Sequence, residues 1–334
     1  MIRLTDLQRT DDLQIALLAV LCFIIAAVQV RYVGDTTIYD EARIDTRQMM
    51  HGRILHNDAP EGGWDSIGAN GVNTRVAVVV LAELIVRVTG VDVPTTYIAL
   101  DLAFIFGALL VLGLFLKSYF ALPEAVGAVA FVGCILPMTF AYHVFHPWDR
   151  PALMVWILAI WAVRHEKLVL CMLLMAIGIA IKWDMIVLPG LYFLAHVTRT
   201  NIVAVVLRCV LIGAVGLAVY AAILYWQPAG HEQRDIVKYV TNNFVVALWL
   251  GPFYPPFLAF CLPVLLSLYG LARADRFAIA AFAFGMFLLV PAFLLSHFVE
   301  VRAQIVALVL TLPCALYGLR RLLAFAKVPV AAGD

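Results

Sequence analysis

The chain has 334 residues, of which 64% are hydrophobic and only 13% are charged, and its mean hydropathy is +0.97. A water-soluble domain carries about a quarter charged residues, so the composition excludes that class and indicates a protein that faces lipid. A net charge of +1 provides no basic surplus, and no nucleic-acid partner is expected. The six cysteines lie inside apolar runs without metal-ligand spacing, and we interpret them as small core residues.

In a bilayer, every backbone polar group must find its partner within the protein, so apolar runs of about 17 to 25 residues become helices. The sequence therefore predicts an all-α fold, a polytopic transmembrane helical bundle of about ten membrane helices. We expect residues 1–334 to form a single transmembrane domain with no soluble domain. The predicted helices cover residues 15–33, 95–116, 121–141, 151–163, 168–181, 184–197, 202–226, 255–271, 277–296 and 303–319.

One further apolar run, residues 76–86, decides the predicted topology. It is short, is flanked by arginines and is interrupted by Glu83, which is typical of a helix that lies at the interface. If it does not cross, residues 34–94 form one external loop with juxtamembrane helices, and both termini are cytoplasmic. This arrangement follows the positive-inside rule and predicts a multi-pass protein of the plasma (inner) membrane. It places these basic residues in the cytoplasm: Arg3, Arg9, Lys117, Arg164, Lys167, Arg199, Arg273, Arg276, Arg320, Arg321 and Lys327.

With this orientation, the remaining polar clusters lie at the external face, in residues 35–65, 143–150, 182–184, 231–238 and 297–302. Ionisable residues near membrane depth cost several kcal/mol unless they are paired or hydrated, so a cluster on one side indicates a functional site. The alternative is that these are ordinary polar loops, and residues 231–238 alone are typical of a solvated or interfacial helix.

The first external loop has the most specific pattern. At helical spacing Asp40, Arg43 or Ile44, Arg47 and His51 share a face, so a carboxylate sits beside two guanidinium groups. This combination suits a reaction with a phosphate leaving group: the carboxylate deprotonates an acceptor hydroxyl and the arginines neutralise phosphate oxygens. Alternatively, Asp40 caps the helix and the arginines bind lipid headgroups.

The second cluster contains His143, His146, Trp148 and Asp149 at the outer ends of adjacent helices. The two histidines have a spacing that also allows metal binding, and Trp148 is alternatively an interfacial anchor. For Asp149, a functional and a structural role are both open. Asp101, near the outer end of helix 95–116, either hydrogen-bonds a neighbouring helix or lines the same cavity.

Two later clusters supply further candidates. Lys182 stands between two short apolar segments and suits a lipid phosphate, with an internal contact to Asp184 as the alternative. His297, Glu300 and Arg302 join the last two predicted helices. Arg302 could hold a phosphate that Glu300 orients, or the two form an interfacial ion pair.

The order of these motifs resembles the GT-C superfamily of integral membrane glycosyltransferases, in particular the lipid A aminoarabinose transferases and protein O-mannosyltransferases. The resemblance rests on Asp40-Glu41-Ala42-Arg43 after the first helix, on Asp149 at the outer start of a later helix, and on the stretch from Gly178 to Lys182. It covers roughly residues 15 to 190. The chain departs from the family in residues 57–65, which show no clear basic or histidine residue followed by proline, and we expect none of the long soluble C-terminal domain of several members.

The resemblance implies that Asp40 is the catalytic carboxylate, that Glu41 is its neighbour, and that Arg43 binds phosphate, with Lys182 and Asp149 as further site residues. It leaves open whether a divalent metal contacts Glu41; no other cofactor is expected. The implied reaction moves a sugar, with inversion, from a polyprenyl-phosphate donor to an extracytoplasmic glycan, lipid or protein acceptor, as in cell-envelope glycan biosynthesis. The polyprenyl chain would enter from the membrane lipid.

Two other functions remain open from the sequence. A transporter or flippase of a lipid-linked sugar would also need cations at the outer rim, although no inverted repeat is evident. A non-catalytic membrane subunit of a glycan-assembly complex would need none of these side chains for chemistry.

Overall fold

The computed structural model describes residues 4–33, 48, 51–56, 74–139, 147–227, 236–249, 255–295 and 301–326, with only the backbone described at several helix ends and in parts of α10. Every regular element within these ranges is helical, as the sequence predicts. The chain divides into two compact units, residues 1–234 and residues 235–334, which are described separately. The single membrane domain expected from the sequence stays a prediction.

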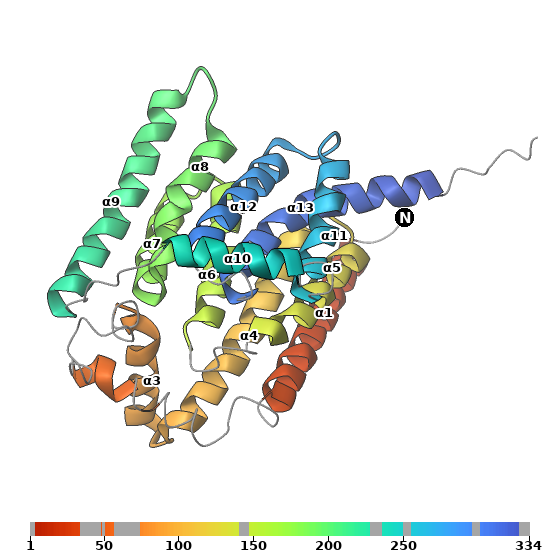
Figure 1. The fold of residues 1–334 in the computed structure, drawn as a ribbon. Helices are drawn as coiled ribbons and strands as arrows, with labels where there is room; N and C mark the ends of the chain where they lie inside the picture. The colour runs from red at the N-terminus through yellow and green to blue at the C-terminus, as the bar shows by residue number, and fades with distance from the viewer. Residues whose placement is uncertain are drawn as a thin grey trace, which may run out of the picture. The chain divides into compact units, whose positions relative to one another are not determined.

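The first unit is built around α4 and α6, which pack against each other, and Figure 1 shows the helices by label. On one side, α1 packs against α4, and α5 packs against both of them. On the other side, α7 packs between α6 and α9, and α8 lies against α6 and α9. The helices of this unit are α1 Leu4–Val33, α3 Val76–Thr89, α4 Val93–Lys117, α5 Leu122–Ile135, α6 Asp149–Arg164, α7 Leu168–Ile181, α8 Leu188–His196 and α9 Ile202–Trp226.

The second unit is arranged around α13, which packs against α11 and α12, while α10 packs against α12. Gly270 and Gly318 let α11 and α13 approach closely, because a Cβ on Gly318 would overlap the Leu266 carbonyl oxygen. Helix α10 is not among the membrane helices predicted from the sequence. The helices of this unit are α10 Ile236–Trp249, α11 Pro255–Gly270, α12 Arg276–Leu295 and α13 Val301–Ala326.

Within the described residues, five helices are long and apolar enough to cross a membrane. The remaining predicted spans are helical but shorter, and the segment predicted over 184–197 begins with a 3₁₀ turn, Trp183–Val187, before α8. The chain is therefore consistent with a multi-pass membrane protein, whereas the count of about ten crossings stays a prediction. The five segments are Asp11–Arg31, Val93–Lys117, Ile202–Trp226, Arg276–Leu294 and Gln304–Phe325.

The turn between α3 and α4 reverses the chain within a few residues, and its sequence explains how. Gly90 follows α3 in the left-handed conformation (φ +73°), where a side chain is disfavoured, and its N–H donates to the Val86 carbonyl. Asp92 then caps α4 by accepting a hydrogen bond from the Thr95 N–H, which also lowers the pKa of the Asp92 carboxyl. Pro94 occupies the first turn of α4, where its missing N–H costs nothing.

Helix α3 does not cross the first unit from end to end. Its 14 residues span about 21 Å, well short of a bilayer core. Arg75, directly before α3, stacks on Trp148 before α6, and Glu83 in its middle contacts His51 of the helical segment 51–56. His51 in turn contacts Tyr97 in the first turns of α4, so both ends of α3 stay at the end of the unit where α4 begins. The short run 76–86 is thus a helix beside α4 rather than a span of the whole unit.

The opposite end of the first unit is tied together by contacts between basic and acidic or aromatic residues. Lys117 at the end of α4 pairs with Asp11 of α1 at 2.9 Å. The Arg164 guanidinium at the end of α6 lies 4.2 Å from the centre of the Tyr119 ring. Basic residues that the sequence assigns to the cytoplasm therefore gather at one end of this unit.

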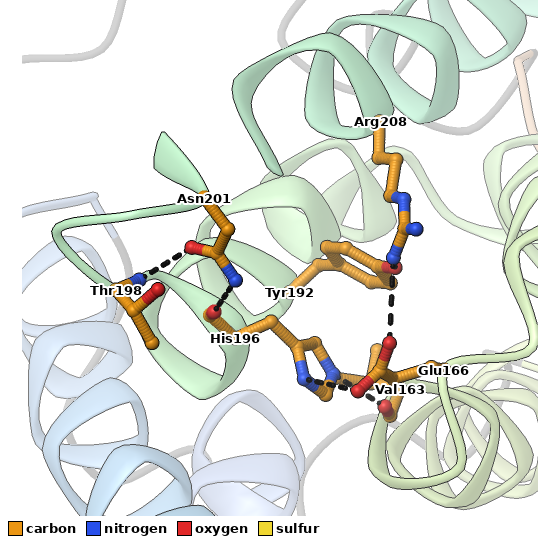
Figure 2. A network of polar contacts seen from close by, with 7 residues as sticks. All are labelled: Val163, Glu166, Tyr192, His196, Thr198, Asn201 and Arg208. Carbon is orange, nitrogen blue, oxygen red and sulfur yellow. Dashed lines mark hydrogen bonds and ion pairs between the residues drawn. The ribbon is translucent and has the colours of Figure 1, made fainter. Parts of the chain in front are cut away.

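A further network at that end joins the α6–α7 turn to α8 and α9 (Figure 2). Glu166 lies in the left-handed region (φ +52°), and its carboxylate faces His196 at 3.6 Å and Arg208 at 3.4 Å. The other ring nitrogen of His196 donates to the Val163 carbonyl at 2.7 Å, and Arg208 also donates to the Tyr192 hydroxyl. The Glu166 carboxylate is more than half exposed, so these ion pairs contribute little energy and serve mainly to hold three helix ends together.

The two ends of the first unit can be distinguished by labelling. We expect single cysteines introduced by His56→Cys and Thr200→Cys, both at exposed positions, to react with an impermeant maleimide from opposite sides of the membrane. The six native cysteines lie in apolar helices, where lipid limits their reaction with the maleimide. Replacing them would lower the background labelling further. Whole cells and inverted vesicles should give reciprocal patterns. Labelling of both positions from one side would contradict the arrangement of α4 to α9.

Candidate functional site

Three consecutive residues at the start of α6 are the centre of a buried charged cluster. Neighbouring residues at a helix start point about 100° apart, so Trp148, Asp149 and Arg150 face three different elements. Asp149 pairs with Lys182 at the end of α7, with 3.0 Å between the carboxylate Oδ1 and the Lys182 Nζ. Lys182 is only 14% exposed and also lies 3.4 Å from the Asp184 carboxylate. The ammonium group is therefore held between two carboxylates.

The two other members of the tripeptide reach α4 and the start of α3. Arg150 faces Asp101 of α4 at 4.0 Å between Nε and Oδ1, and both side chains are only 2% exposed. Trp148 is fully buried, and the Arg75 guanidinium lies 4.6 Å from the centre of its ring. The tripeptide thus links α3, α4 and α7, and Trp148 belongs to the interior of the unit rather than to a lipid-facing aromatic belt.

Local sequence explains how Lys182 reaches this position. A Cβ on Gly178 would overlap the Met185 side chain, so glycine is required for the turn 183–187 to fold back onto α7. Lys182 ends α7 in an extended conformation, with its N–H still bonded to the Gly178 carbonyl. Asp149 stands in the first turn of α6, where the helix dipole favours a negative charge.

The described cluster is electrically balanced. Three cations, Arg75, Arg150 and Lys182, are matched by three carboxylates, Asp101, Asp149 and Asp184. Burial makes these charges mutually dependent, because removal of one partner leaves the other as an uncompensated ion. A phosphate could join the cluster if Lys182 exchanged a carboxylate partner for it, or if further cations came from the first loop.

A second polar chain lies at the same end of the unit. His51, only 5% exposed, contacts the Tyr97 hydroxyl at 2.9 Å and Glu83 Oε2 at 3.2 Å. Arg87 donates to the other carboxylate oxygen of Glu83 at 2.6 Å. The hydrogen bond from Arg87, followed by that from His51, lowers the pKa of the Glu83 carboxyl below its ordinary value of 4.5.

The structure brings together three of the residues proposed from the sequence and leaves most of the others outside its described residues. Lys182, Asp149 and Asp184 lie in one cluster, and Lys182 contacts both carboxylates, so its internal contact with Asp184 is real but not its only one. Arg302 lies in α13 with only its backbone described. The remaining predicted site residues lie outside the described residues: Asp40, Glu41, Arg43, Arg47, His143, His146, His297 and Glu300.

Sequence reasoning did not identify several members of these clusters. Asp101 was recognised as a carboxylate inside an apolar helix, and that anomaly could have prompted a search for a cation at similar depth, which Arg150 supplies. In the sequence, Arg75 flanks the short apolar run 76–86 and Glu83 interrupts it. The pairing of Glu83 with Arg87, four residues later on α3, follows a local helical pattern. Their other partners, Trp148 and His51, come from elements distant in the sequence, so no local pattern identifies them.

The described residues contain no group of three or more His, Cys, Asp or Glu side chains that could hold a metal ion. Comparisons of the chain with protein-family models, with curated proteins and with solved structures found no match.

We expect Lys182→Met to destabilise the protein by about 2–4 kcal/mol, because it leaves the buried Asp149 carboxylate without its cation. Asp149→Asn in the same background should recover part of that loss. Thermal or denaturant unfolding in detergent of both single variants and the double variant measures the coupling. Lys167→Met, at the exposed start of α7, is the matched control and should change stability by under about 0.5 kcal/mol. Additive effects of the two site substitutions would contradict the pairing.

The His51–Glu83–Arg87 contacts predict an acid-dependent loss of stability. The folded-state pKa of Glu83 lies below its unfolded value, so this carboxylate stabilises the fold above pH 4.5, and the contribution is lost as the pH falls through the folded-state pKa. Thermal unfolding of the wild type should therefore show a larger decrease between pH 6 and pH 3 than that of Glu83→Gln. Parallel pH profiles for the two proteins would show that Glu83 has no such role.

Proposed function

We propose that this chain is a membrane glycosyltransferase of the GT-C type, which transfers a sugar from a polyprenyl-phosphate donor to an acceptor hydroxyl outside the cytoplasm. The observation that supports it best is the charged cluster around Trp148, Asp149 and Arg150. This cluster lies at the end of the first unit where α4 begins. Buried ionisable groups at the edge of a membrane bundle are costly and are characteristic of functional sites.

The orientation that this function requires is supported by the distribution of charge. Lys117, Arg164 and Arg208 gather at the end opposite the cluster. Under the positive-inside rule, that end is cytoplasmic and the cluster is external. In the proposed bundle of about ten crossings, the shorter helices α5, α6, α7, α8 and α11 also cross, and their length is compensated by thinning of the bilayer or by flanking polar residues.

The proposed chemistry is a single displacement. The Asp40 carboxylate takes the proton of the acceptor hydroxyl, the hydroxyl oxygen bonds to the anomeric carbon, and the bond from that carbon to the phosphate oxygen breaks. The electron pair leaves with the polyprenyl phosphate, and the anomeric configuration is inverted. Phosphate is a weak base, so the leaving group needs cations rather than a general acid.

The described cluster pairs three cations with three carboxylates, so in this proposal further cations come from the first loop. Arg43 and Arg47 would supply the cations that balance the phosphate, by forked hydrogen bonds to its oxygens. Lys182 would stand beside them and exchange one of its two carboxylate partners for a phosphate oxygen. Glu41, and any divalent metal bound there, would add to the same charge balance.

The reaction can be tested with purified protein reconstituted into vesicles that contain a polyprenyl-phosphate sugar labelled in the sugar, with a cell-envelope extract as the acceptor source. A transferase releases unglycosylated polyprenyl phosphate and labels an acceptor. A transporter moves the intact molecule between leaflets without cleavage, and a non-catalytic subunit does neither. Either of the last two results would overturn the proposal.

In this assay we expect Asp40→Asn to lower the transfer rate at least about 100-fold, because the amide keeps the shape of the side chain and loses its basicity. Asp45→Asn, the same substitution five residues later, is the matched control and should retain activity close to that of the wild type. Unfolding temperatures should be similar for both variants. Transfer by Asp40→Asn at the wild-type rate would show that another group is the base.

A further inference from the structure

The two carboxylates beside Lys182 hold its ammonium group unequally. Asp149 Oδ1 accepts a hydrogen bond from Lys182 Nζ at 3.0 Å, and the Asp149 side chain is only 7% exposed. Asp184 lies farther away, with 3.4 Å between its Oδ2 and the same nitrogen, and its side chain is 37% exposed. Asp149 is therefore the tighter partner of Lys182, and Asp184 is the looser one.

The Asp184 carboxylate is also poorly satisfied where it stands. Its Oδ1 is buried and has no hydrogen-bond partner within the described residues. A buried acceptor without a partner has lost its hydration and gained nothing in return, and the loss is larger for a charged group. Because more than a third of the side chain is already exposed, a rotation towards water would hydrate this carboxylate.

Asp149 does not have the same freedom. Release of Lys182 would leave the Asp149 carboxylate as an uncompensated ion inside the unit. Asp149 also stands in the first turn of α6, where the helix dipole favours its charge. An ammonium group has three N–H donors, and the hydrogen bond to Asp149 uses only one of those on Lys182. An incoming anion can therefore bind Lys182 in place of Asp184 while Asp149 keeps the ammonium group oriented.

We infer that Asp184 occupies the place of the substrate phosphate at Lys182 and is displaced when the phosphate binds. This inference rests on the proposed glycosyltransferase function and specifies which carboxylate is exchanged. A phosphate oxygen suits this place because, like a carboxylate oxygen, it is an anionic acceptor for a compact ammonium charge. Lys182 keeps an anionic partner throughout, since the phosphate replaces the carboxylate.

The exchange makes Asp184 an internal competitor of the phosphate. It competes with the sugar donor, and it competes equally with the polyprenyl phosphate that the proposed reaction leaves behind. Release of product limits the turnover of many enzymes, so a competitor that weakens product binding favours turnover. The role assigned to Asp184 is therefore to keep phosphate binding at Lys182 reversible.

The test measures the binding of farnesyl phosphate, a short-chain analogue of polyprenyl phosphate, to the purified full chain in detergent by isothermal titration calorimetry. Farnesol has the same chain without the phosphate and reports the binding of the chain alone. Asp184→Asn keeps the shape of the side chain and removes its charge. Asp11→Asn removes a carboxylate from Lys117 at the opposite end of the unit and is the matched control.

We expect Asp184→Asn to lower the Kd of farnesyl phosphate at least about 3-fold, because the phosphate no longer competes with a carboxylate for Lys182. Lys182→Met should raise that Kd at least about 10-fold. In the Lys182→Met background, Asp184→Asn should have no effect, because the competition requires the ammonium group. Asp11→Asn should bind farnesyl phosphate as the wild type does, and farnesol binding should be the same in Asp184→Asn and the wild type.

A second background keeps the test decisive if Lys182→Met folds poorly. Adding Asp149→Asn removes the uncompensated carboxylate, and the effect of Asp184→Asn is then measured in that double variant. Unchanged or weaker binding of farnesyl phosphate by Asp184→Asn alone would overturn the inference. Equal tightening with and without Lys182 would also overturn it, because Asp184 would then act only by general repulsion of anions.

The outcome is separate from that of the transfer assay. If neither the wild type nor Asp184→Asn bound farnesyl phosphate more tightly than farnesol, Lys182 would hold no phosphate and the inference would fail. The expected binding pattern in a protein that transfers no sugar would support the exchange at Lys182 and refute the transferase proposal alone. Sugar transfer by a protein in which Asp184→Asn leaves the Kd unchanged would refute the exchange alone.

Discussion

The structure of the first unit depends on one constraint: a charge placed among apolar helices must find its partner inside the protein. Lys182 stands between two apolar segments, where an unpaired ammonium group would cost several kcal/mol, and it is stabilised by Asp149 of another helix. Because Asp149 begins α6 and Lys182 ends α7, this pairing fixes where the two helices meet. The residues on either side of Asp149 make two more contacts: Arg150 faces Asp101, and Trp148 lies against the Arg75 guanidinium.

Burying these charges costs desolvation free energy, which apolar side chains in the same place would not cost. Apolar residues of similar volume can often replace buried ion pairs with little loss of stability, so several such pairs in one place are consistent with the proposed site. In the proposed reaction, the substrate phosphate would redistribute these partnerships, with the cations of the first loop restoring the balance.

The two ends of the first unit differ in how their charges are arranged. At the end with the α6–α7 turn, Glu166, His196 and Arg208 partner one another near the surface and hold helix ends together (Figure 2). At the other end, Asp149 and His51 are buried, and Lys182 is 14% exposed. The ion pairs of the first kind are exposed and weak, whereas water screens the buried charges of the second kind less.

The sequence alone determined the helical class, the apolar runs that become helices, and the shortness of residues 76–86, because these follow from hydropathy and from local signals such as Gly90, Asp92 and Pro94. It also singled out Lys182 as a charge without a local reason, and it left a functional and a structural role open for Asp149. Only the tertiary structure decided that these two pair, that Asp101 faces Arg150, and that His51 bridges α3 and α4. Those contacts join residues 30 to 50 positions apart, and their geometry depends on how helices pack and on where Gly178 allows the chain to fold back, which no local pattern encodes.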